Sequence, residues 1–240
     1  MAREPLEPPI WTRPEPGARK PRWSRAEIAA AALRIADGEG FDAVSMRRVA
    51  AELGAGTMTL YHYVRGKADL VALMDDALLA ELLVPPSELP AAWRPAIELI
   101  ARRTRATFLR HPWALVALLG ALPGPNGLRH ADQSLAALRS ATLSDAARLE
   151  LVALVDDYVF GHCLRAGEAA AADDVPPDVA EAVRAFTEGE IARGHLPELA
   201  RLGARGEDPV DRSAAALEAR FERGLALLLD GAAAQMSAAS

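Results

Sequence analysis

Residues 44–67 read VSMRRVAAELGAGTMTLYHYVRGK, and this stretch decides the fold of the first part of the chain. Its apolar residues give each half one narrow stripe at helical spacing, formed by Val49, Leu53, Leu60 and Val64. Gly54 and Gly56 lie between the halves, where glycine relieves the steric cost of a sharp reversal. Because helices this short need each other's packing, the pattern predicts a helix-turn-helix.

The second helix of this pair is predicted to present hydroxyls and phenols and no carboxylate. With Leu60 and Val64 turned inward, its free surface carries Thr57, Thr59, Tyr61 and Tyr63. Arg47 and Arg48 precede this surface and Arg65-Gly66-Lys67 follows it, where phosphates on either side of a groove would lie. The stretch therefore predicts a DNA-binding surface, with a polar face on an ordinary helical hairpin as the alternative.

The run VAAELGAGTMTLYHYVRGKADL, residues 49–70, closely resembles the DNA-binding head of the tetracycline-repressor (TetR) family of transcriptional regulators. The resemblance implies contacts to bases or backbone from Arg47, Thr57, Met58, Thr59, Tyr61 and Tyr63, and a phosphate contact from Lys67. Many relatives have histidine where this chain has Tyr63, with His62 beside it. Base preference at the outer half-site is therefore not carried over.

The residues before this stretch divide into an arm and a first helix. Residues 1–23 contain six prolines and no periodicity, which predicts a disordered or extended arm. Its basic cluster, residues 19–22, would either contact DNA or only aid solubility. Ser24 and Glu27 have capping-box spacing, and Gly38 and Gly40 end the helix that they begin. We therefore expect a head over residues 24–67.

After the head, every cue predicts helices, so the expected fold class is all-α. A connecting helix over residues 68–87 ends at two prolines and joins the head to a helical body, residues 88–240. Within the body we expect helices near residues 91–109, 113–119, 128–141, 144–168, 178–192 and 213–229. The third of these should turn Leu128, Ala131, Leu135 and Leu138 inward, and His130 should be exposed. A loop should follow residue 192.

Two of the predicted body helices carry more apolar surface than one local core can cover. In the helix of residues 144–168 the stretch LELVALVDDYVFGHCLRAG is apolar nearly all round, and the last helix has a similar surplus. This pattern predicts a homodimer through a bundle of helices, as the last two long helices form in TetR-like proteins. The predicted interface residues are Val152, Val159, Leu217, Phe221, Leu225 and Leu228.

The resemblance extends loosely into the body. His111-Pro112-Trp113, Ser144 and residues 154–161 are similar to the tetracycline-repressor type of carboxyl-terminal domain, which implies a cavity for a small effector. We expect a mostly apolar, aromatic effector, although these side chains could also simply fill the core. Residues aligned with the magnesium-binding set of tetracycline-binding relatives are Leu118 and Arg165, so tetracycline-magnesium is not expected. The predicted lining is Trp93, Phe108, Trp113, Leu118, Tyr158, Phe160, His162 and Arg165.

Charge and composition bound the remaining functions. Residues 1–67 hold 11 Lys and Arg against 8 Asp and Glu, whereas the rest holds 16 against 25, so nucleic acid should bind at one end. One cysteine, Cys163, makes neither an internal disulfide nor a zinc site. No apolar run reaches membrane-spanning length and no signal peptide is evident, so we expect a cytoplasmic protein without membrane attachment.

The sequence shows no constellation of catalytic residues. His162 and Cys163 are neighbours on a helix and diverge, and Asp156 and Asp157 lie too far from His162 in sequence for helical metal ligands. We expect no cofactor and no metal. These two carboxylates are interpreted as partners of arginine at the dimer seam, with a role as ligand acceptors as the alternative.

Together these observations predict a homodimeric, ligand-responsive transcriptional repressor that binds a palindromic operator in double-stranded DNA. A DNA-binding protein without a ligand response is the alternative. An enzyme on a helical scaffold is a remote one.

Overall fold

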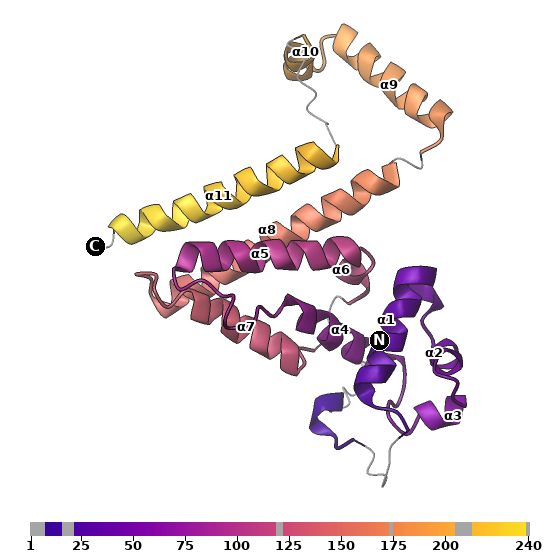
Figure 1. The fold of residues 1–240 in the computed structure, drawn as a ribbon. Helices are drawn as coiled ribbons and strands as arrows, with labels where there is room; N and C mark the ends of the chain where they lie inside the picture. Colours follow the sequence, from indigo (N-terminus) through magenta and orange to yellow (C-terminus); the bar gives the residue numbers. More distant parts are fainter. Residues whose placement is uncertain (1–7, 16–21, 119–121, 173–174, 205–212, 239–240) are drawn as a thin grey trace, which may run out of the picture.

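The computed structural model describes residues 8–15, 22–118, 122–172, 175–204 and 213–238, and over these residues the chain is all-helical, as predicted (Figure 1). The first part contains η1 (Ile10–Thr12), α1 (Arg25–Glu39), η2 (Phe41–Ala43), α2 (Met46–Glu52), α3 (Thr57–Leu60) and α4 (Lys67–Leu82). The rest contains α5 (Trp93–Arg110), α6 (Ala114–Ala117), α7 (Pro125–Ala137), α8 (Asp145–Ala172), α9 (Pro177–Ala192), α10 (Pro197–Gly203) and α11 (Ala214–Ala238). Within the described ranges no helix is long and apolar enough to cross a membrane.

Local hydrogen bonds begin and end α1 where the sequence predicts. Ser24 accepts from the amide of Glu27 at 3.2 Å, and the Glu27 carboxylate accepts from the Ser24 amide at 2.7 Å. Ile28 and Ile35 are buried on the inner face of the helix. Gly40 then stops α1 with φ at +86°, a conformation that a side chain would make costly.

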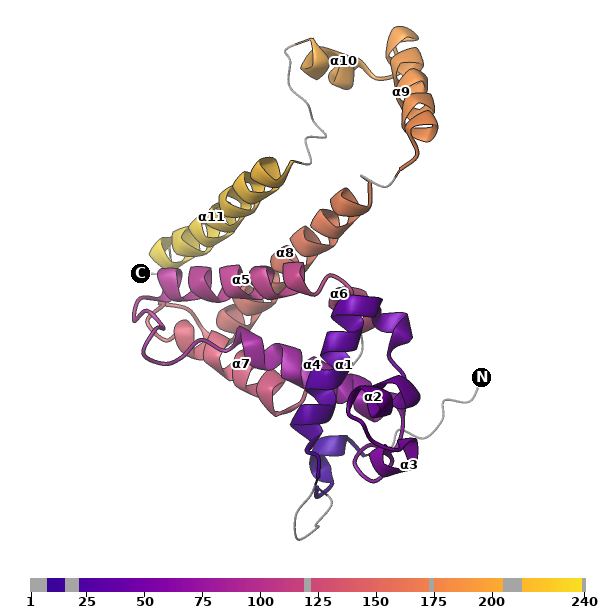
Figure 2. The same ribbon diagram turned by 45° about the vertical axis from the view of Figure 1, so that its right-hand side comes forward.

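Helix α4 is shared by the head and the body. It packs against α1 on one side and α7 on the other, and also contacts α5 (Figures 1 and 2). Leu70, Met74 and Leu78 have no exposed surface. Burial of each of these three side chains stabilises the folded state by about 1.5–3 kcal/mol. Because α4 packs against both α1 and α7, the head and the body form one packed unit.

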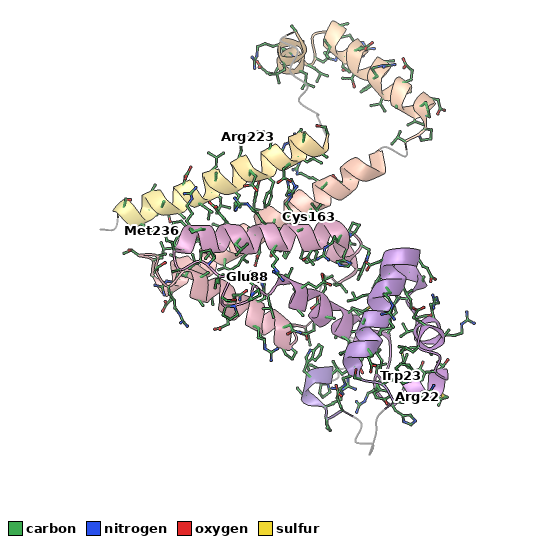
Figure 3. All side chains as sticks on the ribbon, viewed as in Figure 1. Arg22, Trp23, Glu88, Cys163, Arg223 and Met236 are labelled. Atoms are coloured by element: carbon green, nitrogen blue, oxygen red, sulfur yellow. The ribbon has the colours of Figure 1, made fainter. Side chains whose placement is uncertain are left out.

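In the body, α8 packs between α5 and α11. Cys163 lies on α8 against the backbone carbonyl of Arg105 (Figure 3). On α11, Phe221 and Leu225 are buried whereas Arg223 is exposed on the outer side. Helices α9 and α10 pack on each other and lie away from the packed part of the body (Figures 1 and 2).

Residues 8–15 correct the prediction of a disordered arm. Ile10, in η1, is 1% exposed and belongs to the main core. The backbone of this segment is hydrogen-bonded by Arg25 on α1. Apolar burial and paired backbone carbonyls offset the entropy that a proline-rich segment otherwise keeps. The other residues of the predicted arm, apart from Arg22 and Trp23, lie outside the described ranges.

Helix α7 differs from its prediction in register. It begins at Pro125, earlier than expected, and Leu128 is 61% exposed rather than inward. Small residues lie on the covered side of α7 instead: a β-carbon added at Gly127 would lie 3.1 Å from Cδ1 of Leu79 on α4, and Ser134 is buried. Of the four residues expected inward, Leu138 is fully buried, Leu135 half-buried and Ala131 exposed. His130, expected to be exposed, is half-buried, and burial lowers its pKa.

Other helix ends also differ. Helices α8 and α11 continue to Ala172 and Ala238, beyond the predicted ends. Residues 197–203 form α10 where a loop was expected, with Pro197 in its first turn. Proline at that position loses no intrahelical bond, so it starts this helix rather than preventing it.

The contact between α8 and α11 depends on a glycine. The Tyr158 hydroxyl donates to the backbone carbonyl oxygen of Phe221 at 2.9 Å. A β-carbon added at Gly224 would lie 2.6 Å from Cζ of that tyrosine ring. The tyrosine can therefore reach the α11 backbone only beside a residue without a side chain.

We expect Gly224→Ala to destabilise the protein by about 1–3 kcal/mol through overpacking against Tyr158. Gly231→Ala is the matched control on the same helix, because no atom lies within 4 Å of its added β-carbon. That change should stabilise by about 0.5–1 kcal/mol through helix propensity. Urea unfolding at equal protein concentration measures both. A gain in stability for both variants would contradict the predicted contact.

Candidate functional site

The turn between α2 and α3 is set by local backbone geometry. Ser45 begins α2 by accepting from the amide of Arg48 at 3.2 Å. Gly54 has φ at +62°, in the left-handed region that glycine adopts without steric cost, and it reverses the chain. Gly56 is extended, as any residue can be, so only one of the two glycines needs its conformational freedom.

Helix α3 is held by two buried anchors and exposes its opposite face. Leu60 and Val64 are 0% and 1% exposed. On the other face Met58 is 76% exposed and Tyr61 45% exposed. Of the residues predicted to contact DNA, Arg47, Met58, Thr59, Tyr61 and Lys67 are exposed, and Thr57 and Tyr63 are half-buried. The seven residues thus lie on α2, α3, the following turn and the start of α4.

The cations around α3 have different roles. Arg47 on α2 precedes α3 in the chain, Lys67 at the start of α4 follows it, and both are exposed. Arg48 is instead held between two carboxylates, with Nε 3.1 Å from Oε1 of Glu39 and Nη1 3.0 Å from Oε2 of Glu52. A hydrogen bond from Arg48 lowers the pKa of Glu39. Arg48 therefore ties α2 to the end of α1 in this structure.

Two body residues bind the head directly. Asp37 on α1 accepts from the indole Nε1 of Trp113 at 2.8 Å and lies 2.6 Å from Nδ1 of His111. The Trp113 ring also stacks on Phe41, with 5.7 Å between ring centres. Trp113 was also predicted to line the effector cavity. In this structure Trp113 and His111 join the end of α5 to α1.

A buried carboxylate joins α4 to α7. Asp76 is 6% exposed and accepts from the amide nitrogen of Asn126 at 2.7 Å and from its side-chain nitrogen at 2.8 Å. It thereby caps the N-terminus of α7, where negative charge is favourable. A β-carbon at Gly124 would lie 2.6 Å from Cγ of Asp76, so glycine is required there. Neighbouring Asp75 has its pKa raised to about 6 by burial and by the charge of Asp76.

The aromatic residues predicted to surround one cavity are distributed over several contacts. Phe108 and Phe160 meet edge to face, with 5.2 Å between their ring centres. Tyr158 stacks instead on Phe221 of α11, and Trp93 is half-buried at the start of α5. Leu118, predicted to line the same cavity, is buried. Phe108 and Phe160 are therefore the pair from this set that lies together between α5 and α8.

Of the two polar residues predicted to orient the effector, His162 is buried and Arg165 is exposed. His162 is 7% exposed, and its ring centre lies 5.0 Å from that of Phe221. The guanidinium of Arg105 lies 4.6 Å from the centre of the same ring. Burial first, and then the charge of Arg105, lower the pKa of His162. Arg165 is exposed, and the arginines whose charges act on His162 are Arg105 on α5 and Arg220 on α11.

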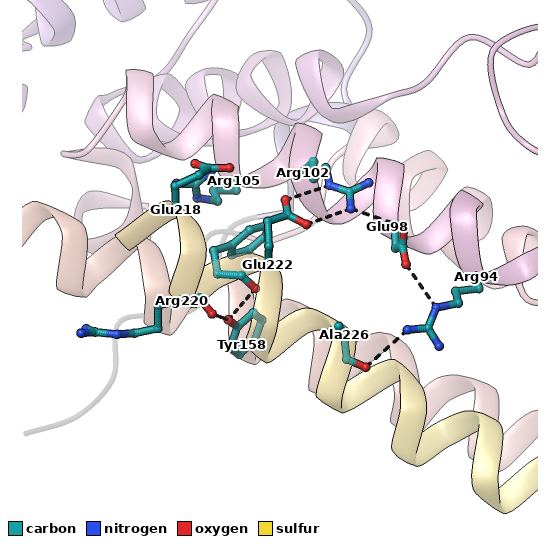
Figure 4. A network of polar contacts seen from close by, with 10 residues as sticks. Arg94, Glu98, Arg102, Arg105, Tyr158, Glu218, Arg220, Glu222 and Ala226 are labelled. Carbon is teal, nitrogen blue, oxygen red and sulfur yellow. Dashed lines mark hydrogen bonds and ion pairs between the residues drawn. The ribbon is translucent and has the colours of Figure 1, made fainter. Parts of the chain in front are cut away.

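Arg105 belongs to a ladder of ion pairs between α5 and α11 (Figure 4). The pairs are Arg94–Asp230 at 2.7 Å, Arg102–Glu222 at 2.9 Å and Arg105–Glu218 at 2.6 Å. A hydrogen bond from Arg102 lowers the pKa of Glu222. The sequence shows both charged stripes at helical spacing, and that signal could have indicated the ladder. Only their antiparallel placement decides the pairing.

The residues predicted for a dimer interface fall into two groups. Val159, Phe221 and Leu225 are at most 1% exposed within the single chain, so they join α8 to α11 and offer no surface to a partner. Val152, Leu217 and Leu228 are half-buried. Other large apolar side chains on the two helices are exposed, namely Leu149 at 58%, Leu154 at 48%, Leu164 at 44% and Leu227 at 73%.

Asp156 and Asp157 lie on α8, between the predicted interface residues Val152 and Val159 in sequence. The pKa of Asp156 is raised to about 6 by burial and by the charge of Asp157. Within the described part of one chain, neither carboxylate forms an ion pair with an arginine. Their predicted pairing across a dimer seam stays a prediction.

The fold and the α3 surface define a helix-turn-helix regulator with a helical body. Residues 28–74 match the profile of bacterial regulatory proteins, tetR family, and residues 85–236 match that of the tetracyclin repressor-like, C-terminal domain. Because these matches cover most of the chain, it belongs to the TetR family. It is a DNA-binding transcriptional regulator and not an enzyme.

Individual relatives agree with this assignment. The chain is 38% identical over 197 residues to HTH-type transcriptional repressor DrrR1 of Streptomyces coeruleorubidus, covering 80% of this chain and 68% of that one. An HTH-type transcriptional regulator of Saccharopolyspora erythraea is 36% identical over 154 residues, covering 63% and 65%. The TetR family protein ActR of Streptomyces coelicolor, solved in complex with actinorhodin, has a TM-score of 0.73 and 28% identity, covering 91% and 99%.

Proposed function

We propose that the chain is a ligand-responsive repressor that binds a palindromic operator as a homodimer and is released by a small, mostly apolar effector. The observation that carries this proposal is the exposed face of α3, which has the exposed cations Arg47 before it and Lys67 after it in the chain. We divide the chain accordingly into a DNA-binding head (24–67), a connecting helix (68–87) and an effector-binding and dimerisation body (88–240). A DNA binder without a ligand response remains the second candidate.

The α3 face suits the major groove of DNA. Met58 is a large apolar side chain that the protein leaves 76% exposed, and such a group can contact a thymine methyl. Thr59 and Tyr61 add hydroxyls that can bond base edges or phosphates. Arg47 and Lys67, which precede and follow α3 in the chain, would neutralise phosphates. Because α3 is short, one head reads few base pairs, and a two-fold dimer doubles the site.

The outer faces of α8 and α11 support the dimer. Leu154, Leu164 and Leu227 are exposed there although the same helices bury other apolar residues inside the chain. The ladder from α5 holds α11 in place, so its outer face is preformed. A bundle of α8 and α11 with their copies would cover these residues.

The effector would bind near Phe108, Phe160 and His162, between α5 and α8. A signal from there can reach the head through two fixed contacts, the Asp76 cap between α4 and α7 and the Asp37 contacts of α1. A hundredfold loss of operator affinity needs only about 2.7 kcal/mol of coupling. ActR was solved in complex with actinorhodin, which adds support for a small-molecule effector by similarity alone.

For the DNA contacts, we expect duplexes selected from a random pool to be palindromic, with half-sites about 34–36 Å apart or a multiple of that distance. Lys67→Ala should weaken binding to selected and random duplexes alike and reduce the salt slope by about one. Met58→Ala should weaken only the selected duplex. Arg184→Ala, which removes a charge from α9, is the control. Equal losses on both duplexes for both head variants would contradict base reading by α3.

For the dimer, Leu227→Glu should give a monomer. It places an unpaired carboxylate in the proposed interface, at a cost on the order of 3–5 kcal/mol, while the 73% exposure of Leu227 predicts an intact fold. Leu128→Glu on α7, whose side chain is 61% exposed, is the control and should stay dimeric. Sedimentation at micromolar concentration measures both variants. If the unmutated protein is itself a monomer at this concentration, the proposed interface between α8, α11 and their copies is wrong.

For the effector, a screen of aromatic compounds should find one that raises the melting temperature and releases the selected duplex. Phe160→Ala and His162→Ala should weaken its action at least about tenfold, a loss of about 1.4 kcal/mol. Arg165→Ala should leave it unchanged because that side chain is exposed. If active compounds act equally on all three variants, their site lies elsewhere. If none releases DNA, the second candidate replaces the first.

A further inference from the structure

Residues 8–15, which we call the strap, lie outside both matched family profiles and pack on the head. Ile10 is 1% exposed and belongs to the core that includes α1 and α4. Trp11 reaches the start of α7, where its ring carbon Cζ2 would lie 2.7 Å from a β-carbon at Gly124. The strap therefore contacts the head and approaches the body at α7.

One arginine of the head fixes the backbone of the strap. Arg25, in the first turn of α1, donates to the carbonyl oxygens of Ile10 at 2.9 Å, Arg13 at 3.0 Å and Pro14 at 3.3 Å. Hydrogen bonds from a charged donor are stronger than neutral ones. The carbonyl oxygen of Ile10 also accepts from the Arg13 amide at 3.2 Å, so this single guanidinium adds a second bond there and pairs the carbonyl groups of Arg13 and Pro14.

A second arginine connects the strap to the turn after α3. The Arg13 guanidinium forms an ion pair with Asp69 in the first turn of α4, and the two side chains are 16% and 15% exposed. The other oxygen of the same carboxylate accepts from the backbone amide of Arg65 at 2.8 Å. Asp69 is therefore a bridge between the strap and residues 65–67, the turn that ends at Lys67.

We propose that the strap positions the DNA-contacting turn 65–67, with Arg13 acting through Asp69 rather than by touching DNA. The proposal rests on the proposed function, since it assumes that Lys67 contacts a phosphate. Arg13 has two effects on the turn. It orients the carboxylate that holds the Arg65 amide, and it neutralises a negative charge that would otherwise repel phosphates beside Lys67.

The exposure of Arg13 favours this indirect role. Its guanidinium is engaged by a carboxylate and is mostly covered, whereas Arg47 and Lys67 are exposed. An arginine that contacted phosphate directly would have to leave Asp69 unpaired and partly desolvated, which is unfavourable. Arg13 is thus a positioning residue.

The test is a double-mutant cycle on the full chain with the selected duplex. Arg13→Ala should weaken binding about tenfold, and Arg13→Lys, which keeps the charge, should weaken it by less than about threefold. Asp69→Asn removes the negative charge and keeps an oxygen that can accept from Arg65. In the Asp69→Asn background, Arg13→Ala should then change binding by less than about twofold. Arg34→Ala, which removes another positive charge from the head, is the control for net charge and should show the same effect in both backgrounds.

An equal loss from Arg13→Ala in both backgrounds would mean that Arg13 acts independently of Asp69, and would overturn the proposal. No loss in either background would do the same.

A second measurement needs no DNA. Hydrogen exchange at the Arg65 amide should be at least about fivefold faster in Arg13→Ala than in the unmutated protein and unchanged in Arg34→Ala. If no duplex is ever selected, the proposed function fails, and unaltered exchange at Arg65 would separately refute positioning by the strap.

Discussion

The packing of α4 between α1 and α7 is the constraint on which the rest of the structure depends. Leu70, Met74 and Leu78 have no exposed surface, so α4 cannot move against either neighbour without opening the core. Asp76 adds a polar lock, because a buried carboxylate that loses Asn126 would be left unpaired. A change of body structure must therefore either carry the head with it or break these contacts, which makes α4 the natural route of regulation.

Helix α11, unlike α4, is held against one of its neighbours largely by ion pairs. Its inner face packs on α8, whereas its contacts with α5 include partly exposed ion pairs such as Arg102–Glu222 and the Arg105 guanidinium over the ring of Phe221. Exposed pairs contribute little stability, typically up to about 1 kcal/mol, yet a row of them specifies how two helices are aligned. The ladder is therefore better understood as setting the position of α11, and with it the outer face that we assign to the dimer, than as a source of stability.

The head is stabilised from three directions that the family resemblance alone does not indicate. Arg48 ties α2 to α1, the pair of His111 and Trp113 ties α1 to the end of α5, and the strap ties α1 to α4. A head held in this way has few internal degrees of freedom. In the dimer that we propose, control of DNA binding is then expected to act on the spacing of the two heads rather than on the shape of one head.

The sequence by itself determined the elements whose signals are local. The Ser24 and Glu27 capping box, the left-handed Gly40 and the buried spacing of Leu60 and Val64 each depend on residues within a few positions of one another. It also placed the candidate DNA-facing residues on and around α3. Tertiary structure alone decided that Ile10 is buried, that Leu128 faces solvent and that the charge of Arg105, from another helix, acts on His162. Those outcomes depend on which helix faces are brought together across dozens of residues, and a local pattern holds no information about that choice.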